Sequence, residues 1–345
     1  MILALITPYY FPSVRGNSVT VQRIESGLRD HGITVRVFSL DQDSPEKVHA
    51  ALLELQPQVV HGFHATATGP LIVEVSRRLR VPTVITLTGT DVNHDLLDPA
   101  RQPTVFETLG AVQAIVVFHE SVRSRLLREC PTAGPRVHVI GQAVQCGEDV
   151  YDLRHRLGLT PADIVFFQAA GIRPVKNIPS IIPPLTRLQA RHPRLKYVLA
   201  GPVIDDQEGA RVKALLQGLP WAFDLGTLTR DEICAILTQV EVAVNSSLSE
   251  GGMSNAVLEA MSRGVPVLAS DIPGNRSIIQ DGVDGFLYDT EAAFTAHAET
   301  LLTQPACRAA LGRQARRKIA TQFRLEGEIG GHLALYRALL ARAEP

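Results

Sequence analysis

The sequence lacks several features that would assign it to a class at once. Its four cysteines, Cys130, Cys146, Cys234 and Cys307, form no CxxC pair, and it has a single tryptophan. Cysteines this scattered exclude a small zinc or disulfide scaffold, so we expect reduced thiols and a cytoplasmic protein. No apolar run approaches the roughly 20 residues that cross a membrane, so we expect no transmembrane segment.

An excess of charge of one sign is also missing. The chain has 34 Lys and Arg against 35 Asp and Glu, which gives a net charge of −1. A protein that grips nucleic acid over a broad surface needs a basic excess, so no nucleic-acid partner is expected. The apolar start, MILALITPYYFPS, lacks a basic leader and a small-residue cleavage site. A buried first strand explains it better than a signal peptide.

What the chain does have is a regular alternation of short β-rich runs with longer helical patterns. One series runs from ILALIT to RVHVIG, and a second runs from DIVFFQAAG to PVLAS. Such alternation predicts parallel sheets with helices on both faces. A length of 345 residues suits two domains.

We therefore expect an α/β protein with two doubly wound, Rossmann-like domains that face a central cleft. The predicted domains are residues 1–147 and 159–324, and residues 325–345 are predicted as a terminal helix that packs back on the N-terminal domain. Doubly wound sheets bind ligands at the carboxyl ends of their strands. The cleft between the halves is therefore the expected site.

The stretch SEGGMSNAVLEAM follows the predicted strand VEVAVNSS and opens a helix. Gly251 and Gly252 allow the backbone to approach a ligand closely. Ser254 or Asn255 can cap the helix by accepting a hydrogen bond from an unpaired N–H group. Free N–H groups and the positive end of the helix dipole make this loop a predicted anion site.

Two carboxylates, Glu250 and Glu259, flank this loop, although an anion site needs neither. They are explained by a ligand that carries both phosphates and hydroxyls, because a carboxylate accepts strong hydrogen bonds from hydroxyl groups. A nucleotide sugar has this mixture. The alternatives are an exposed ion pair between Glu259 and Arg263, four residues apart, and a solvated loop carboxylate at Glu250.

Basic residues follow the first strand of the second domain, in the segment AAGIRPVKNIP. Gly171 marks a turn, and Arg173 and Lys176 come after it. Two cations at the carboxyl end of a strand suit a diphosphate, with arginine as a planar fork and lysine as a point charge. The alternative is a solvated loop. The position favours the site, because the Glu250 loop lies at the same edge of the same predicted sheet.

The segment NSSLSEGGMSNAVLEAMSRGVPVLASDIPGNRSIIQDGVDGFLYD resembles the donor-binding region of retaining GT-B glycosyltransferases of family 4. That family has a glutamate, a glycine-rich loop and a second glutamate, then phrases like EAMAxGxPVxAS and DGxxGFL. The Arg-x-x-Lys element, the YVLAGP strand and the LGTLTRDEICAIL segment follow the family's order. Phrases such as GTDVN are similar to those of glycosyltransferase 1 domain-containing proteins, and LTGTD resembles bacterial selenosugar synthases.

The resemblance implies roles for residues of this chain. Glu259 would hold the ribose hydroxyls, Glu250 the donor sugar, and Arg173 and Lys176 the leaving diphosphate. The remaining donor-side residues that it implies are Gly16, Asn17, Gly171, Gly226, Thr227, Leu228, Gly251, Gly252, Met253, Ser254, Asn255, Ala256 and Val257.

The chain departs from the family pattern at three places. Eight residues separate Glu250 from Glu259, where the family usually has seven. Where the family usually has two glycines in the N-terminal loop, this chain has Arg15-Gly16-Asn17. Thr88, in VITLTGTDVNHD, stands where many relatives have a histidine beside the reacting sugar.

Residues near the strand ends of the first domain are candidates for contact with the acceptor. These acceptor-side candidates are His61, His64, Thr88, Asp91 and His94. For a single histidine among them, a structural role is the commoner alternative. Peripheral membrane contact through the arginines of SVRSRLLREC is a further hypothesis, and a solvated helix face is the favoured alternative. The phrase DQD at residues 41–43 reads as a surface turn, and no metal site is predicted.

Together these features predict a retaining, metal-independent glycosyltransferase that needs no cofactor. Its co-substrate is a nucleoside-diphosphate sugar, a UDP- or GDP-sugar, and its acceptor is unidentified. One alternative is sugar transfer to a small thiol or selenium nucleophile. Another is a catalytically inactive nucleotide-sugar-binding protein. A nucleotide-sugar epimerase uses the same architecture, but the Glu250–Glu259 loop and the LEAM phrase favour transfer.

Overall fold

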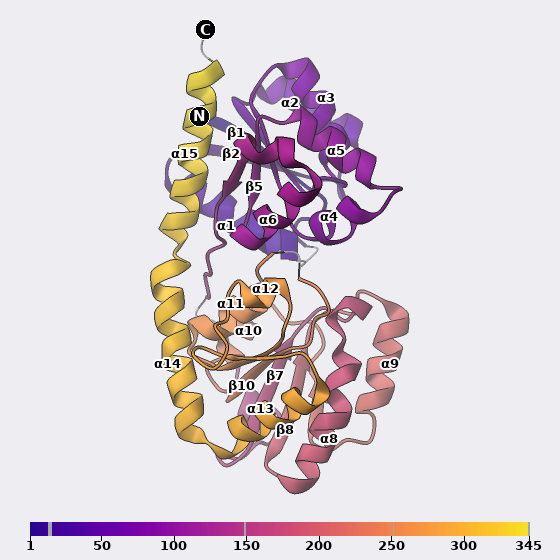
Figure 1. Ribbon diagram of the computed structural model, residues 1–345, viewed down its shortest axis with the longest axis vertical. Coiled ribbons are helices and arrows are strands. Elements are labelled where there is room, and N and C mark those ends of the chain that lie inside the picture. Colours follow the sequence, from indigo (N-terminus) through magenta and orange to yellow (C-terminus); the bar gives the residue numbers. More distant parts are fainter. Residues whose placement is uncertain (13–15, 148–149, 251, 344–345) are drawn as a thin grey trace. The chain divides into compact units, whose positions relative to one another are not determined.

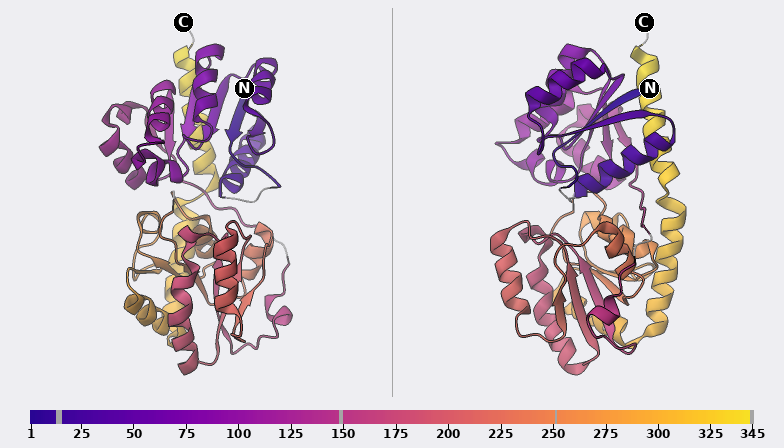
Figure 2. Two further views of the ribbon diagram at one scale, coloured as in Figure 1. Left: turned by 90° about the vertical axis from the view of Figure 1, so that its right-hand side faces the viewer. Right: turned by 180° about the vertical axis from the view of Figure 1, so that it is seen from behind.

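The computed structural model describes residues 1–12, 16–147, 150–250 and 252–343. The chain forms two compact units (Figures 1 and 2). The first comprises Met1–Ala143 together with the segment from Phe323 onward, and the second is Val144–Gln322. The C-terminal segment is thus part of the first unit.

The first unit is built around a parallel sheet of six strands in the order β2-β1-β3-β4-β5-β6. The strands are β1 (Ile2–Thr7), β2 (Thr34–Ser39), β3 (Val59–Phe63), β4 (Thr83–Thr86), β5 (Ala114–Val117) and β6 (Val137–Val139). The α-helices are α1 (Gly16–Asp30), α2 (Pro45–Leu55), α3 (Gly69–Leu79), α4 (Thr90–Asn93), α5 (Gln102–Ala111), α6 (Glu120–Glu129) and α15 (Leu325–Ala343). Short 3₁₀ turns are η1 (Asp95–Leu97) and η2 (Pro131–Arg136).

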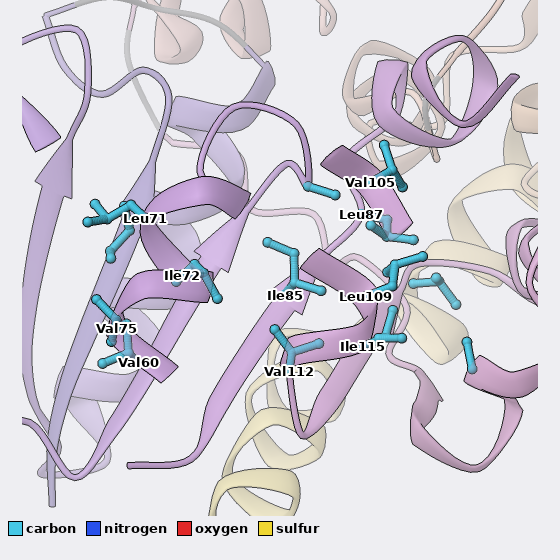
Figure 3. Close-up of a cluster of buried hydrophobic side chains, with 14 of the residues drawn as sticks. Val60, Leu71, Ile72, Val75, Ile85, Leu87, Val105, Leu109, Val112 and Ile115 are labelled. Carbon is cyan, nitrogen blue, oxygen red and sulfur yellow. The ribbon is translucent and has the colours of Figure 1, made fainter. Parts of the chain in front are cut away.

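Both faces of this sheet are buried, and alternate residues of each strand serve opposite faces. Leu3 and Leu5 of β1 pack with α1 and α15, whereas Ala4 and Ile6 pack with the cluster under α2, α3 and α5. Figure 3 shows part of the second cluster, where Leu71, Ile72 and Val75 of α3 lie beside Val60 of β3. Continuous apolar strands such as ILALIT are therefore explained by a sheet that is covered on both sides.

Helix α15 packs against α1 in the first unit (Figures 1 and 2). Arg23 of α1 makes a buried, bidentate pair with Glu328 of α15, with N–O distances of 2.6 and 2.9 Å. The backbone N–H of Ala143 donates to the same carboxylate at 3.1 Å. At Gly27 the helices are so close that an added Cβ would lie 2.5 Å from Ile329. Charge pairing and close packing therefore hold α15 to this unit.

The second unit also has a parallel sheet of six strands, in the order β12-β11-β10-β7-β8-β9. The strands are β7 (Ile164–Ala169), β8 (Leu195–Ala200), β9 (Ala222–Asp224), β10 (Val242–Asn245), β11 (Val267–Ser270) and β12 (Phe286–Tyr288). The α-helices are α7 (Leu153–Arg156), α8 (Ile182–Arg191), α9 (Asp206–Leu216), α10 (Arg230–Ile236), α11 (Asn255–Ser262), α12 (Pro273–Arg276), α13 (Glu291–Thr303) and α14 (Pro305–Gln322). Short 3₁₀ turns are η3 (Pro174–Lys176) and η4 (Ile178–Ile181).

The strand order of the second unit determines where its sheet leaves a crevice for a ligand. Going outwards from β7, the chain first adds β8 and β9 on one side and then β10, β11 and β12 on the other. Strands β7 and β10 are therefore neighbours whose following loops diverge, with Phe167 opposite Ala243. This arrangement is a topological switch point, where doubly wound sheets leave a crevice for ligands.

The prediction that all four cysteines are reduced is wrong. Cys146 and Cys234 form a disulfide, with Cα atoms 5.7 Å apart, and only Cys130 and Cys307 are free thiols. The bridge joins the start of the second unit to α10 across 88 residues. No local spacing reveals such a pair, because only the fold brings the two segments together.

Two features are absent from the residues that the structure describes. No helix among residues 1–12, 16–147, 150–250 and 252–343 is long and apolar enough to cross a membrane. No group of three or more histidine, cysteine and acidic side chains in the same ranges is arranged to hold a metal ion.

Candidate functional site

The loops after β7 and β10 are joined to each other at the switch point. The N–H of Leu248 donates to the carbonyl of Val175 at 2.8 Å, and the Ser246 hydroxyl donates to the carbonyl of Lys176 at 2.7 Å. Gln168, buried on β7, donates to the Ser246 hydroxyl at 2.9 Å. The two loops that carry the predicted cations and carboxylates therefore form one structural assembly.

Glu250 lies at the centre of this assembly. Its Oε1 accepts hydrogen bonds from Lys176 Nζ at 2.6 Å, from the Ser247 hydroxyl at 2.7 Å and from Asn245 Nδ2 at 3.1 Å. Burial raises the pKa of Glu250, but the Lys176 ammonium and the hydrogen bonds from Ser247 and Asn245 outweigh burial and lower it overall. Glu250 is therefore an ionised carboxylate with fixed geometry, and the alternative of a solvated loop carboxylate is wrong.

Helix α11 begins beside Glu250. As in anion sites at helix N-termini, the side chain at its N-cap position does not bind the N–H groups of the first turn. Ser254 occupies the N-cap position, but its side chain accepts no hydrogen bond from the first turn. Its hydroxyl instead accepts from Asn245 Nδ2 at 3.2 Å. The expected capping role of Ser254 is thus wrong. Because this side chain is held elsewhere, it does not occupy the N–H groups of the first turn.

Glu259, on the second turn of α11, is buried and pairs with an arginine from another helix. Arg230 Nε, at the start of α10, donates to Glu259 Oε1 at 2.8 Å. The alternative ion pair with Arg263 is wrong, because Arg263 donates to the carbonyl of Gly147 at 2.6 Å. Helix α10 starts here because Thr229 and Glu232 form a capping box. This places Arg230 in reach of the carboxylate.

The other predicted residues of this unit lie on neighbouring strand ends. Arg173 is exposed, and within the residues that the structure describes its guanidinium has no hydrogen bond or ion pair. Gly171 and Gly226 lie after β7 and β9, and Gly201 after β8 lies between them. The Gly201 N–H donates to the carbonyl of Gly226 at 2.8 Å, and a Cβ on Gly201 would overlap the carbonyl of Ala170. Gly201 therefore lets these three loops meet.

The structure places the remaining predicted donor-side residues at three locations. Thr227 and Leu228 follow Gly226, and Gly252, Met253, Asn255, Ala256 and Val257 belong to the Glu250 loop and the first turn of α11. In the first unit, Gly16 and Asn17 are the first residues of α1, and a Cβ on Gly16 would meet nothing within 4 Å. Gly251 and Arg15 lie outside the described residues.

His61 lies in the core of the first unit and not on the surface at the strand ends, which is the structural alternative to an acceptor contact. It is fully buried at the centre of the first sheet, and its ring nitrogens lie 2.6 Å from the hydroxyls of Tyr336 and Thr86. Its ring stacks on Phe63 with centroids 4.5 Å apart. Burial lowers the pKa of His61 well below its usual value, so the ring is neutral. His61 is a core residue of β3 whose side chain packs against Tyr336 of α15.

Asp91 is also buried, and it shapes the loops after β3 and β4. Its carboxylate accepts hydrogen bonds from the N–H groups of Ala65 at 3.0 Å, Gly89 at 2.6 Å and Val92 at 3.1 Å, and from that of Thr88. Because backbone N–H groups engage its oxygens, Asp91 has a structural role instead of the predicted contact with the acceptor. It fixes the loop that carries Thr88.

Two histidines and a threonine stay on the surface of this edge. Thr88 is half-buried and His94 is exposed. His64 has a left-handed backbone with φ of 76°, and its Nε2 lies 2.7 Å from the hydroxyl of Thr90. A side chain held in this uncommon conformation is often functional. Of the acceptor-side candidates, His64, Thr88 and His94 keep that prediction.

The arginines of SVRSRLLREC make local contacts on α6. Arg123 pairs with Glu120 at 2.7 Å, and Arg125 donates to the Asn93 side chain. Two of the three arginines are therefore engaged within the protein, which supports the favoured alternative over membrane contact.

Sequence reasoning missed Arg230, Asn245 and Asn275 as members of the site. The capping box in LTRDE could have placed Arg230 at the start of a helix beside the Gly226 turn. Asn245, the last residue of β10, could have been recognised as a buried polar residue at a strand end. Nothing local marks Asn275, because its partners lie five and thirty residues away.

This geometry agrees with the family match. Residues 151–318 match the family described as glycosyl transferases group 1. The chain carries a glycosyl transferases group 1 domain. Several curated relatives are named as glycosyltransferases, and with the family match they show that the chain is a glycosyltransferase enzyme.

The relatives extend over both units of this glycosyltransferase. Glycosyltransferase 1 domain-containing protein 1 of Xenopus tropicalis is 26% identical over 91% of each chain. A D-inositol 3-phosphate glycosyltransferase of Nocardioides is 28% identical over 67% of this chain and 56% of its own length.

Solved structures confirm the predicted fold. Sucrose-phosphate synthase from Thermosynechococcus elongatus superimposes with a TM-score of 0.87 at 17% identity and covers 99% of both chains. Anabaena HepE in complex with UDP and glucose has a TM-score of 0.80 at 16% identity, covering 98% of this chain and all of that one. The glycosyltransferase has the GT-B fold, with two Rossmann-like domains.

Proposed function

We propose that this glycosyltransferase moves a sugar from a nucleoside-diphosphate sugar to an acceptor with retention of the anomeric configuration and without a metal ion. The observation that supports the proposal best is the assembly at the switch point. It combines an ionised glutamate, a lysine, the N-terminus of α11 and the buried Glu259. The carboxylates can accept hydrogen bonds from the sugar and ribose hydroxyls, and the lysine and the helix N-terminus can bind the phosphates.

The donor is proposed to bind with its ribose at Glu259, which Arg230 orients, and its sugar hydroxyls near Glu250. The phosphates lie toward the first turn of α11, Lys176 and Arg173. UDP is the favoured nucleotide, because HepE is described in complexes with UDP and with UDP-glucose. GDP remains the second candidate.

Transfer breaks the bond between the sugar C1 and the leaving phosphate oxygen and forms a bond from C1 to the acceptor oxygen. Positive charge develops on the sugar and negative charge on the phosphate. Arg173, Lys176 and the N–H groups of α11 stabilise the negative charge in place, which is electrostatic preorganisation. The leaving phosphate oxygen takes the proton of the acceptor on the same face. These cations do the work that a metal ion would do, which is why we propose metal independence.

The acceptor is proposed to contact His64, Thr88 and His94 at the carboxyl edge of the first sheet. Relatives named for D-inositol 3-phosphate and L-malate suggest small anionic alcohols as the first acceptors to test. A cytoplasmic location stays a prediction, and the Cys146–Cys234 disulfide removes the thiol argument on which it rested.

The test of this proposal is a proton NMR assay of product formation. The enzyme is incubated with UDP-glucose or GDP-glucose, with inositol 3-phosphate, malate or water as acceptor, in EDTA and in Mg²⁺. We expect an α-linked product at equal rates in both buffers. A β-linked first product would contradict retention, and activity only in Mg²⁺ would contradict metal independence.

A further inference from the structure

The carboxamide of Asn245 occupies a central place in the network around Glu250. Asn245 is the last residue of β10, and only 6% of it is exposed. Its Nδ2 donates to Glu250 Oε1 at 3.1 Å and to the Ser254 hydroxyl at 3.2 Å. Its Oδ1 accepts from the Ser247 N–H at 3.1 Å and from Asn275 Nδ2 at 3.2 Å. Two donors and two acceptor positions are thus all used.

This single amide connects the two ends of the glycine loop. Glu250 stands before the glycines, and Ser254 follows them at the N-cap of α11. Because Asn245 holds the Ser254 hydroxyl, that hydroxyl does not cap the helix. The amide therefore sets the position of the carboxylate and also keeps the Ser254 side chain away from the N–H groups of the first turn.

A second layer of polar contacts supports the amide from behind. Asn275 of α12 is fully buried and also donates to the Ser270 carbonyl at 2.9 Å. The Ser270 hydroxyl donates to the carbonyl of Ser247. At Gly274 an added Cβ would lie 2.6 Å from the Gly252 carbonyl and 2.7 Å from the Glu250 Cβ. The network is therefore packed against the glycine loop as well as hydrogen bonded.

The asparagine side chain can donate hydrogen bonds, whereas an ionised aspartate, its closest isostere, can only accept them. Lys176, Ser247 and Asn245 all donate to the same oxygen of Glu250. An aspartate at position 245 would be an acceptor only, so it would lose both donated hydrogen bonds. It would also place a second negative charge about 3 Å from Glu250, which disfavours the ionised form of both carboxylates.

We propose that Asn245 is a positioning residue for sugar transfer, which holds the Glu250 carboxylate and the Ser254 hydroxyl in place around the donor sugar. This inference rests on the proposed function, because it assumes that the Glu250 loop binds a nucleotide sugar. Asn245 acts through Glu250 and Ser254 and does not touch the reacting atoms.

The role predicts a specific kinetic pattern for Asn245→Asp. Nucleoside diphosphate affinity should fall by a smaller factor than kcat, because Glu259 and Arg230 are untouched. The kcat for UDP-glucose should fall at least tenfold, and the acid limb of its pH profile should move up by about one pH unit or more. Asn245→Ser, which keeps a donor, should recover part of the kcat and the wild-type acid limb.

Gln168→Glu is the matched control. Gln168 is buried at a neighbouring strand end and donates to Ser246, but no hydrogen bond joins it to Glu250 among the residues that the structure describes. Its replacement also buries a new carboxylate in the same sheet. We expect a loss of thermal stability without a shift of the acid limb. A shift in Asn245→Asp alone therefore reports contact with Glu250 and not general damage.

A carbon NMR titration gives a readout that needs no turnover. The Glu250 carboxyl resonance, assigned by its absence in Glu250→Gln, should titrate at higher pH in Asn245→Asp than in wild type. If wild type binds UDP or GDP but the Glu250 titration and the acid limb are unchanged in Asn245→Asp, the role of Asn245 is overturned and the proposed function stands. If wild type binds neither UDP nor GDP, the proposed function is overturned and this role with it.

Discussion

At the scale of single residues, the two glutamates that flank the glycine loop have different environments. Glu250 receives a lysine and two neutral donors, whereas Glu259 receives an arginine from the start of α10. The residue types and the approximate location were predictable from the spacing of SEGGMSNAVLEAM. The partners were not, because Lys176 and Arg230 lie 74 and 29 residues away in the chain.

Substitutions of the two cations that are predicted to bind phosphate should have similar effects on activity but different effects on stability. Arg173→Ala and Lys176→Ala should each lower kcat at least tenfold, since each removes positive charge from the leaving group. Only Lys176→Ala should also lower the free energy of unfolding, by about 2 kcal/mol, because it leaves the Glu250 carboxylate buried without its ion pair. Chemical denaturation and initial rates check both. Equal stability of the two variants would show that the Lys176–Glu250 pair does not form in solution.

The buried His332 on α15 predicts a pH dependence of stability in the first unit. Burial lowers the pKa of His332 to about 4, although Glu328 opposes this, and its ring nitrogens have no partner among the described residues. Arg23, Glu328, His61 and Tyr336 are the ionisable groups around it.

Between pH 6.5 and 4 the unfolded chain binds a proton that the folded protein excludes, so stability falls as the pH falls. The loss should be about 2 kcal/mol from pH 6.5 to 5, and His61 adds to it in the same direction. Urea titrations at several pH values measure it. His332→Leu should flatten the dependence, and an unchanged slope in that variant would contradict the assignment.

At the scale of elements, the start of a helix is predictable where the sequence carries a clear end signal. Helix α2 (Pro45–Leu55) begins after Ser44, whose side chain accepts a hydrogen bond from the Lys47 N–H, and a serine followed by proline is such a signal. The segment of residues 90–111 was not predicted, because it consists of a single turn, a 3₁₀ turn and one short helix with little periodicity. The segment of residues 178–191 begins as the 3₁₀ turn η4 and continues as α8.

The short helix α12 predicts a test of how the glycine loop is supported. Gly274→Ala should push the Glu250 loop outward, because the new methyl group would overlap Gly252 and Glu250. We expect at least a tenfold weaker affinity for the nucleoside diphosphate sugar, measured by calorimetry. The matched control is Gly110→Ala on α5, where an added Cβ meets nothing within 4 Å. That variant should bind normally and be slightly more stable, and equal effects of the two would refute the explanation.

The Cys146–Cys234 disulfide gives a prediction for the start of the second unit. It closes a loop of 88 residues, so Cys146→Ser should lower the free energy of unfolding by about 2–4 kcal/mol. Cys130 is also half-buried but lies in the first unit as a free thiol, so Cys130→Ser should lower the free energy of unfolding much less. Peptide mapping without reductant checks the pairing. Four alkylated cysteines in unfolded, unreduced protein would show that the bridge is absent.

At the scale of the whole molecule, strand–helix alternation was sufficient to predict two Rossmann-like domains, whereas the GT-B class was implied by the resemblance of the donor-binding segment to a known family. It could not give the strand orders, which place Lys176 and Glu250 on loops that diverge at a switch point. It also gave no warning that His61 and Asp91 would be buried, because a strand-end residue reads the same in sequence whether its side chain is exposed or covered by α15 or a loop. The family match in residues 151–318 lies within the second unit, where the predicted donor residues are concentrated.

The central claim is that the Glu250–Glu259 loop is the site for a nucleotide-sugar donor, and nucleotide binding tests it most directly. The measurement is a thermal-shift panel of UDP, GDP, ADP, TDP and CDP on wild type and on Glu259→Gln, with and without Mg²⁺. A nucleotide at 100 times its dissociation constant should add about 2.7 kcal/mol of stability. We predict a shift with UDP or GDP that is independent of Mg²⁺ and lost in Glu259→Gln. The same shift in the variant, or none in folded wild type, would contradict the account.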